Sequence, residues 1–231
     1  MVNDMTTALT PELLLAGIRQ TRLVAIVRGN DGGDSTIGFE LARYLTKTEL
    51  PPYAESRRLV RNVAAQPDLL KNLDTYSEDL KTNLRDGLPT NLFKPAENGF
   101  FEIVPNEKVT TFARVAPAEN NFRGETFVIA DAANASATFS FLKFVKANRL
   151  ARIVGEESGG NLQGINGGNY YFLNLPNSKI EVDVPVYFFA PLAPQKDSAV
   201  VPDFRVQPTA RDIAAGIDAE LNFILKMIKR K

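Results

Sequence analysis

The chain has 231 residues, 44% of them apolar, so it is long enough to bury a substantial core in one large domain or two small ones. Lysine plus arginine balance aspartate plus glutamate, 27 against 27, which argues against nucleic-acid or membrane binding driven by bulk charge. There is no cysteine and no histidine, which excludes disulfides, thiolate chemistry, and histidine as a general base or metal ligand.

The amino-terminal part predicts a helix, a strand, a glycine-rich loop and a second helix. TPELLLAGIRQ favours a helix capped by Thr10 and running to about Gln20. The apolar run Leu23–Val27 is typical of a strand buried on both faces. The loop Arg28–Asp34 follows, and Ser35 is the expected cap of the next helix.

The first seventeen residues, MVNDMTTALTPELLLAG, contain neither a secretory signal nor a membrane span. We therefore expect a cytoplasmic protein from the sequence as given. A periplasmic or secreted protein whose natural leader had been removed would have the same sequence pattern.

Residues 46–123 differ in character from the rest, because seven prolines interrupt charged, weakly amphipathic stretches. We expect a helical insertion here, acting as a cap or lid, within one core domain of residues 1–231. ETFVIA then predicts a buried strand, and SATFSFLKFVKANR predicts a helix with Phe139, Leu142 and Val145 on its buried face. ARIVGEESGG repeats the pattern of an apolar strand followed by glycines.

The carboxyl-terminal third predicts a hairpin and a helix. Two strands are joined by the turn PNSK, and the second is expected to direct Ile180, Val182, Val184 and Val186 inward. Residues 209–229 predict a helix with basic residues in its last turn.

Three loops, RGNDGG, DAANAS and GEESGG, each follow an apolar strand. If the strands are neighbours in one sheet, the loops meet at their carboxyl ends, where open α/β sheets bind ligands. Ser136, within DAANAS, is then either a helix cap or a nucleophile, and the local sequence alone favours the cap. The aspartates of these loops lack the spacing of a calcium loop, so we expect no metal and no cofactor.

The order of five sequence blocks resembles the carboxyl-terminal processing, or tail-specific, serine peptidases, a family that includes the tricorn core. The blocks are RGNDGG at 28–33, ANASAT at 133–138, ARIVGEESGGN at 151–161, LPNSKIEVDVPV at 175–186 and VPDFRVQPTARDIAAGIDAEL at 201–221. The resemblance implies an α/β fold with a crotonase- or ClpP-like core of β-β-α units. It also implies that Ser136 is the nucleophile, and that the N–H groups of Ala137 and of Gly32 or Gly33 form an oxyanion hole.

The resemblance leaves the general base open. One branch of the family places a lysine twenty-five positions after the serine, where this chain has Asn161, and the chain therefore resembles a branch without that lysine. Asparagine cannot accept the proton of a hydroxyl. Glu156 or Glu157, acting through water, are substitute bases, with Asn161 as an orienting group.

Three functional hypotheses follow. The first is a serine hydrolase that acts on peptides or small esters through an acyl-enzyme at Ser136, with weak activity or with a histidine supplied by a missing amino-terminal segment. The second is a non-catalytic module that binds peptides or apolar ligands. The third is a structural subunit, such as a homo-oligomer, that associates through the insertion or the last helix.

Overall fold

The computed structural model describes residues 22–53, 56–62, 70–104 and 114–229, which form two compact units. Of the described residues, the first unit draws on 22–53, 114–162 and 196–229, and the second on 56–62, 70–104 and 163–195. Residues 46–123, expected as one insertion, are therefore divided between the two units. The helix predicted at residues 10–20 lies outside the described residues.

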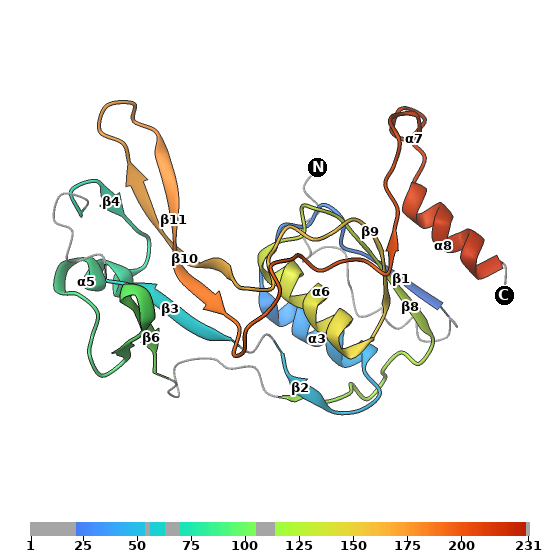
Figure 1. Cartoon of the computed structure of the whole chain (residues 1–231), viewed down its shortest axis with the longest axis horizontal. Helices are drawn as coiled ribbons and strands as arrows, with labels where there is room; N and C mark the ends of the chain where they lie inside the picture. Colours follow the sequence, from blue (N-terminus) through green and yellow to red (C-terminus); the bar gives the residue numbers. More distant parts are fainter. Residues whose placement is uncertain (1–21, 54–55, 63–69, 105–113, 230–231) are drawn as a thin grey trace. The chain divides into compact units, whose positions relative to one another are not determined.

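A parallel sheet of order β1-β8-β9-β12 forms the centre of the first unit (Figure 1). Its strands are β1 (Arg22–Ile26), β8 (Glu125–Ala130), β9 (Arg152–Gly155) and β12 (Phe204–Arg205). A short antiparallel pair, β2 (Leu50–Pro52) with β7 (Arg114–Val115), belongs to the same unit. The predicted strand–loop–helix order is confirmed, and the fold is of the mixed α/β class.

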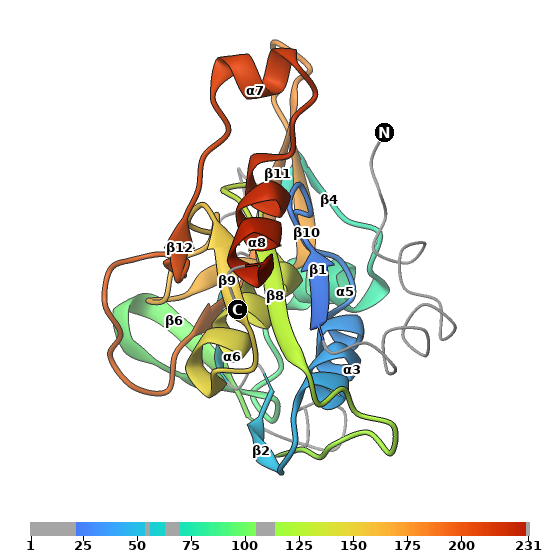
Figure 2. The same cartoon turned by 90° about the vertical axis from the view of Figure 1, so that its right-hand side faces the viewer.

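Helices cover both faces of this sheet, as the views along two axes show (Figures 1 and 2). These helices are α3 (Ser35–Leu45), α6 (Ser136–Asn148) and α8 (Ala219–Lys229), with the short α7 (Ala210–Ala214) preceding α8. Ile224 of α8 packs with Phe127 and Ile129 of β8 in one apolar cluster. Phe139, Leu142 and Val145 of α6 are all buried, as their helical spacing predicted.

Three local expectations for this unit need correction. The cap of α3 is Asp34, whose side chain accepts from the amide of Thr36 at 2.8 Å, and Ser35 is the first helical residue. Strand β1 is not buried on both faces, because it is the edge strand and Ile26 is 55% exposed. Residues 209–229 contain two helices, and Gly216, with a φ of +64°, lies between them.

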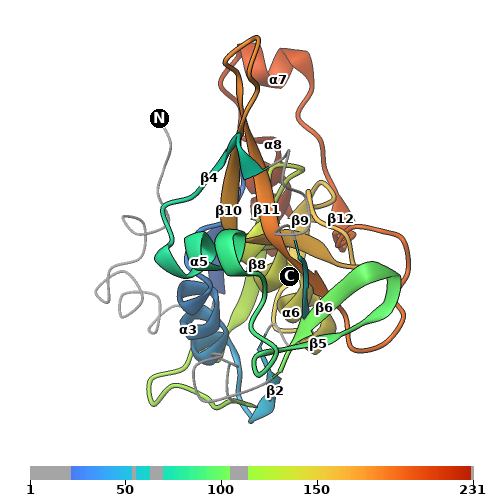
Figure 3. The ribbon, with the colours of Figure 1, turned by 90° about the vertical axis from the view of Figure 1, so that its left-hand side faces the viewer.

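The described part of the second unit contains an antiparallel sheet of order β4-β10-β11-β3-β6-β5, together with helix α5 (Figure 3). Its elements are β3 (Arg57–Arg61), β4 (Leu73–Asp74), α5 (Glu78–Asp86), β5 (Phe93–Pro95), the 3₁₀ turn η2 (Glu97–Gly99), β6 (Phe100–Ile103), β10 (Ile165–Asn174) and β11 (Glu181–Ala190). Leu80 of α5 packs with Val60, Tyr171 and Val186 in the core of this unit.

The prediction of a helical insertion is only partly correct, because the described part of this region contains the short strands β2 to β7 as well as helix α5. Strands such as β3 pair with β11, more than a hundred residues away, and local sequence does not reveal such a partner. The β10–β11 hairpin is confirmed, but Ile180 and Val182 are 58% and 40% exposed. Only Val186 of the four predicted residues is fully buried, since pairing with β3 begins at Tyr187 and leaves the hairpin tip outside the packed core.

Candidate active site

Ser136 is the first residue of α6, and its backbone is strained. Its φ is +48°, in the left-handed region that residues with a side chain rarely adopt. Ser136 comes directly after the loop that follows β8, and it is exposed to solvent. Conformations of this kind cost about 1 to 3 kcal/mol and concentrate at functional sites, so the strain makes Ser136 a functional candidate.

The amino terminus of α6 leaves backbone amides available beside Ser136. Ala135 occupies the cap position, and no side chain among the described residues caps this helix. The N–H of Ala137, at the second helical position, has no partner within a helix. Ser136 is therefore a first-turn residue and not the cap.

The loop after β1 lies directly against Ser136. A Cβ atom built on Gly32 would stand 2.6 Å from the Ser136 Cβ, 3.1 Å from its Oγ and 3.4 Å from the Ala137 nitrogen. The Gly32 N–H already donates to Asn30 Oδ1 at 3.0 Å. Gly33, with a φ of +120°, makes no hydrogen bond through its N–H within the described part of the chain. Of the two candidate glycines, Gly32 is the one that lies against Ser136, and Gly33 is the one whose N–H remains available as a donor.

Asn134, which is completely buried, ties this loop to the loop that carries Ser136. Its side-chain nitrogen donates to the carbonyls of Val27, at 2.6 Å, and Asn30, at 3.0 Å. Its side-chain oxygen accepts from the amide of Asp131 at 2.8 Å. The Asp131 carboxylate in turn accepts from the amide of Gly29 at 3.0 Å. The side chains of Asn134 and Asp131 therefore both bond the loop after β1 to the loop after β8.

A further bond joins the same loop to α6. The Thr138 hydroxyl, completely buried, donates to Asn30 Oδ1, the atom that also accepts from Gly32. The side chain of Asn30 thus links the glycine turn to the first turn of the helix.

The GEESGG loop after β9 packs against the same place. The Gly159 amide donates to the Asn134 carbonyl at 2.9 Å, and the Glu156 amide donates to the Ala130 carbonyl at 2.9 Å. A Cβ on Gly160 would stand 2.3 Å from the ring of Phe139, so a side chain there would displace the loop from α6. The three loops converge, as the parallel order of their strands requires.

The candidate base residues of this loop differ in their contacts. Glu157 forms an ion pair with Arg205, and the side-chain amide of Asn161 donates to Asp197 Oδ1 at 2.7 Å. The Glu156 carboxylate makes no hydrogen bond or ion pair with the described residues. Glu156 is therefore the acid of this loop that remains available.

Lys143 is on the same helix but far from the serine. It follows Ser136 by seven residues, a rise of roughly 10 Å, and burial lowers the pKa of its ammonium group. Within the described ranges no three acidic side chains lie close enough together to hold a metal ion. The same residues include no helix with the length and apolar character to span a membrane.

An ion-paired cluster secures the loop after β1 to the last helix. The Arg28 guanidinium lies 2.8 Å from Asp218 Oδ2 and 2.8 Å from Glu220 Oε2, and the Glu220 side chain is only 2% exposed. Arg28 holds the pKa of the Asp218 carboxyl below its ordinary value, chiefly by hydrogen bonding.

Sequence reasoning did not identify Asn134 or Arg28 as residues that support the site. Asn134 is within the ANASAT block, but its side chain bonds to residues 104 and 107 positions away. Arg28 is 190 positions from Asp218. No local pattern marks partners at such separations.

A strained, exposed serine at the start of the helix that follows a strand and a loop is the arrangement in which many serine hydrolases place their nucleophile. The chain matches the family description "Peptidase family S41" over residues 20–203, more than half of its length. It belongs to this family of carboxyl-terminal processing serine peptidases. No curated protein sequence matches it significantly.

Solved structures with related folds include other peptidases. A putative peptidase from Parabacteroides merdae is 15% identical with a TM-score of 0.52, and the match covers 90% of this chain and 51% of that one. Mature CPAF, in complex with lactacystin, is 16% identical with a TM-score of 0.54, covering 88% of this chain and 43% of that one. At these identities the likeness concerns the fold, and the chain spans about half the length of the structures it matches.

Proposed function

We propose that the protein is a serine hydrolase that forms an acyl-enzyme at Ser136 on peptide or ester substrates. The observation that carries the proposal is the strained, exposed Ser136 between the Ala137 amide and the glycine turn at Gly32 and Gly33. Membership of the S41 family supports it independently. We also propose that the first unit corresponds to a crotonase- or ClpP-like core.

In the proposed reaction the Ser136 Oγ attacks an acyl carbon, and the carbonyl oxygen becomes an oxyanion. The N–H groups of Ala137 and Gly33 are the donors proposed to stabilise this charge, each worth roughly 3 to 4 kcal/mol in comparable sites. The serine proton passes to a base and then to the leaving group. Water afterwards releases the acyl group and regenerates the hydroxyl.

The base of this reaction is neither a histidine nor a lysine at position 161, because the 231 residues include no histidine and residue 161 is an asparagine. We propose that Glu156, through a water molecule, accepts the proton in this chain. A carboxylate is a weak base for this purpose. Esters are therefore the expected substrates, since an alkoxide leaves more readily than an amine.

The experiment that tests this function is labelling with a fluorophosphonate, followed by mass spectrometry of the modified peptide. We expect Ser136 to be labelled and S136A to lose both labelling and p-nitrophenyl ester turnover. S140A is the matched control, because Ser140 is one turn further along α6 and bonds only the Ser136 carbonyl, at 3.2 Å. A folded wild-type protein that is not labelled would rule the proposal out.

A second candidate function is a non-catalytic module that binds peptides or apolar ligands at the same site, and the absence of histidine from the sequence favours it. It predicts ligand binding without turnover. Ester hydrolysis that exceeds the buffer background and depends on Ser136 would exclude it.

A further inference from the structure

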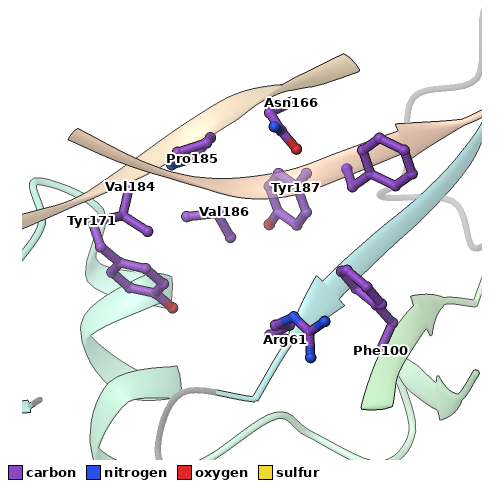
Figure 4. Close-up of a pocket in the computed structure, with 9 residues that line it drawn as sticks. Arg61, Phe100, Asn166, Tyr171, Val184, Pro185, Val186 and Tyr187 are labelled. Carbon is purple, nitrogen blue, oxygen red and sulfur yellow. The ribbon is translucent and has the colours of Figure 1, made fainter. Parts of the chain in front are cut away.

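The second unit contains a cavity of about 340 Å³ whose lining is mainly apolar and aromatic (Figure 4). It is lined by Arg61, Phe100, Asn166, Tyr171, Val184, Pro185, Val186, Tyr187 and Phe188. All of these residues belong to the second unit, so the cavity contains none of the residues assigned to the serine site. A volume of this size suits a small molecule.

The sheet register explains why these side chains meet. Arg61 pairs with Phe100 across β3 and β6, and Asn166 pairs with Phe188 across β10 and β11. Paired residues share one face of a sheet. The Arg61 guanidinium accordingly lies 4.2 Å from the centroid of the Phe100 ring, and the rings of Phe100 and Phe188 are 6.4 Å apart.

The charge at this cavity is not neutralised by the described residues. Arg61 donates to the carbonyl of Asn98 at 3.3 Å and stacks on Phe100, but it pairs with no carboxylate in the part of the chain that the structure describes. The neighbouring acids, Glu97 and Glu102, both form ion pairs with Arg57. The guanidinium therefore retains donors that can bind an anion.

We propose that this cavity binds a small carboxylate with an apolar or aromatic body, and that Arg61 holds the carboxylate. A guanidinium presents parallel N–H groups that match a carboxylate, and stacking on Phe100 fixes its plane. The aromatic and branched lining accommodates the apolar body. Arg61 is the one cation among the described residues that line the cavity, so a monoanion is the matching charge.

The proposal is tested by titrating the protein with 3-phenylpropionate and, separately, with its neutral analogue 3-phenylpropionamide, using calorimetry at low salt. We expect the acid to bind at least about tenfold more tightly than the amide, the effect of a hydrogen bond to a charged group. R61Q should remove this preference and leave the affinity for the amide unchanged.

R58Q is the matched control, because Arg58 is on the same strand at an odd spacing and lies near Phe189, which does not line the cavity. We expect R58Q to retain the preference for the acid. S136A should bind both compounds as the wild type does, which separates this proposal from the hydrolase proposal. Equal affinity for acid and amide in the wild type, no saturable binding of either compound, or equal effects of R58Q and R61Q would each overturn it.

Discussion

The backbone of Gly32 lies in direct contact with the side chain of Ser136, with 2.6 Å between the Ser136 Cβ and the position of a Cβ on Gly32. Real Cβ atoms do not approach this closely, so a side chain at position 32 must displace either the glycine turn or the serine. Because of this contact, the glycine turn and the start of α6 are packed directly against each other.

The first prediction concerns Gly32→Ala. We expect it to reduce fluorophosphonate labelling of Ser136 on the order of a hundredfold, the effect of disturbing an oxyanion donor. The rate of labelling measures it directly. Gly29→Ala is the control, because Gly29 is in the same loop, has a positive φ of +77° and has no atom within 4 Å of an added Cβ. Equal labelling rates for the two variants would show that the close contact is not required.

The second prediction concerns Asn134→Ala. This change removes the side-chain donor to the carbonyls of Val27 and Asn30 and the acceptor of the Asp131 amide, although the Val27 carbonyl still accepts from the Asn30 amide. An unsatisfied buried group costs about 1 to 3 kcal/mol. We expect a loss of about 2 to 3 kcal/mol in the free energy of unfolding by urea, together with slower labelling of Ser136. Asn148→Ala, which removes one bond to the Phe144 carbonyl at the other end of α6, should cost about 1 kcal/mol and leave labelling unchanged.

The third prediction concerns Arg28→Gln, which leaves the buried Glu220 and the nearby Asp218 without their cation. Breaking a fully buried pair costs roughly 3 to 5 kcal/mol. We expect about 2 kcal/mol, because Arg28 and Asp218 are 32% and 31% exposed. Arg114→Gln, which removes an ion pair exposed on both sides, should have a far smaller effect.

The same ion pairs give a pH dependence with a defined sign. Arg28 lowers the pKa of Asp218 in the folded state, so the stabilisation is fully present above the unfolded value of about 3.9 and is lost as the pH falls through the folded pKa. We expect the stability difference between wild type and R28Q to narrow as the pH falls below about 4. Urea unfolding across this range measures it, and a constant difference would contradict the assignment.

The fourth prediction separates the two glutamates of the GEESGG loop. Glu157 is paired with Arg205, whereas Glu156 has no partner among the described side chains. We expect Glu156→Gln to lower Ser136-dependent ester turnover on the order of a hundredfold, the lower end of the range for loss of a general base. Glu157→Gln should have a smaller effect. The opposite order would assign the base to Glu157, and no effect of either would place the base elsewhere.

The sequence predicted much of the first unit, because hydrophobic periodicity acts over one strand or one helix at a time. The apolar run of β8 and the spacing of Phe139, Leu142 and Val145 indicated the central strand and the buried face of α6 correctly. The sequence also indicated Ser136 as a candidate, because one glycine-rich loop precedes it in the chain and another follows it. These are local signals, and neighbouring residues are sufficient to read them.

Contacts between distant residues were not predictable in this way. Strands β3 and β11 of the second unit pair across more than a hundred residues, and the exposure of Ile180 and Val182 depends on where this pairing begins. The support of the serine site likewise depends on Asn134 and Arg28, whose partners are remote in the chain.

The sequence by itself determined the class of the central elements and the position of the candidate serine. Only the tertiary structure decided that Ser136 is a strained first-turn residue and that Gly32 touches it. It also decided that, among the described residues, Glu157 has an ion-pair partner and Glu156 has none. The physical reason is that secondary structure follows from the periodicity of neighbouring side chains, whereas the geometry of a site depends on loops that only the completed sheet brings together.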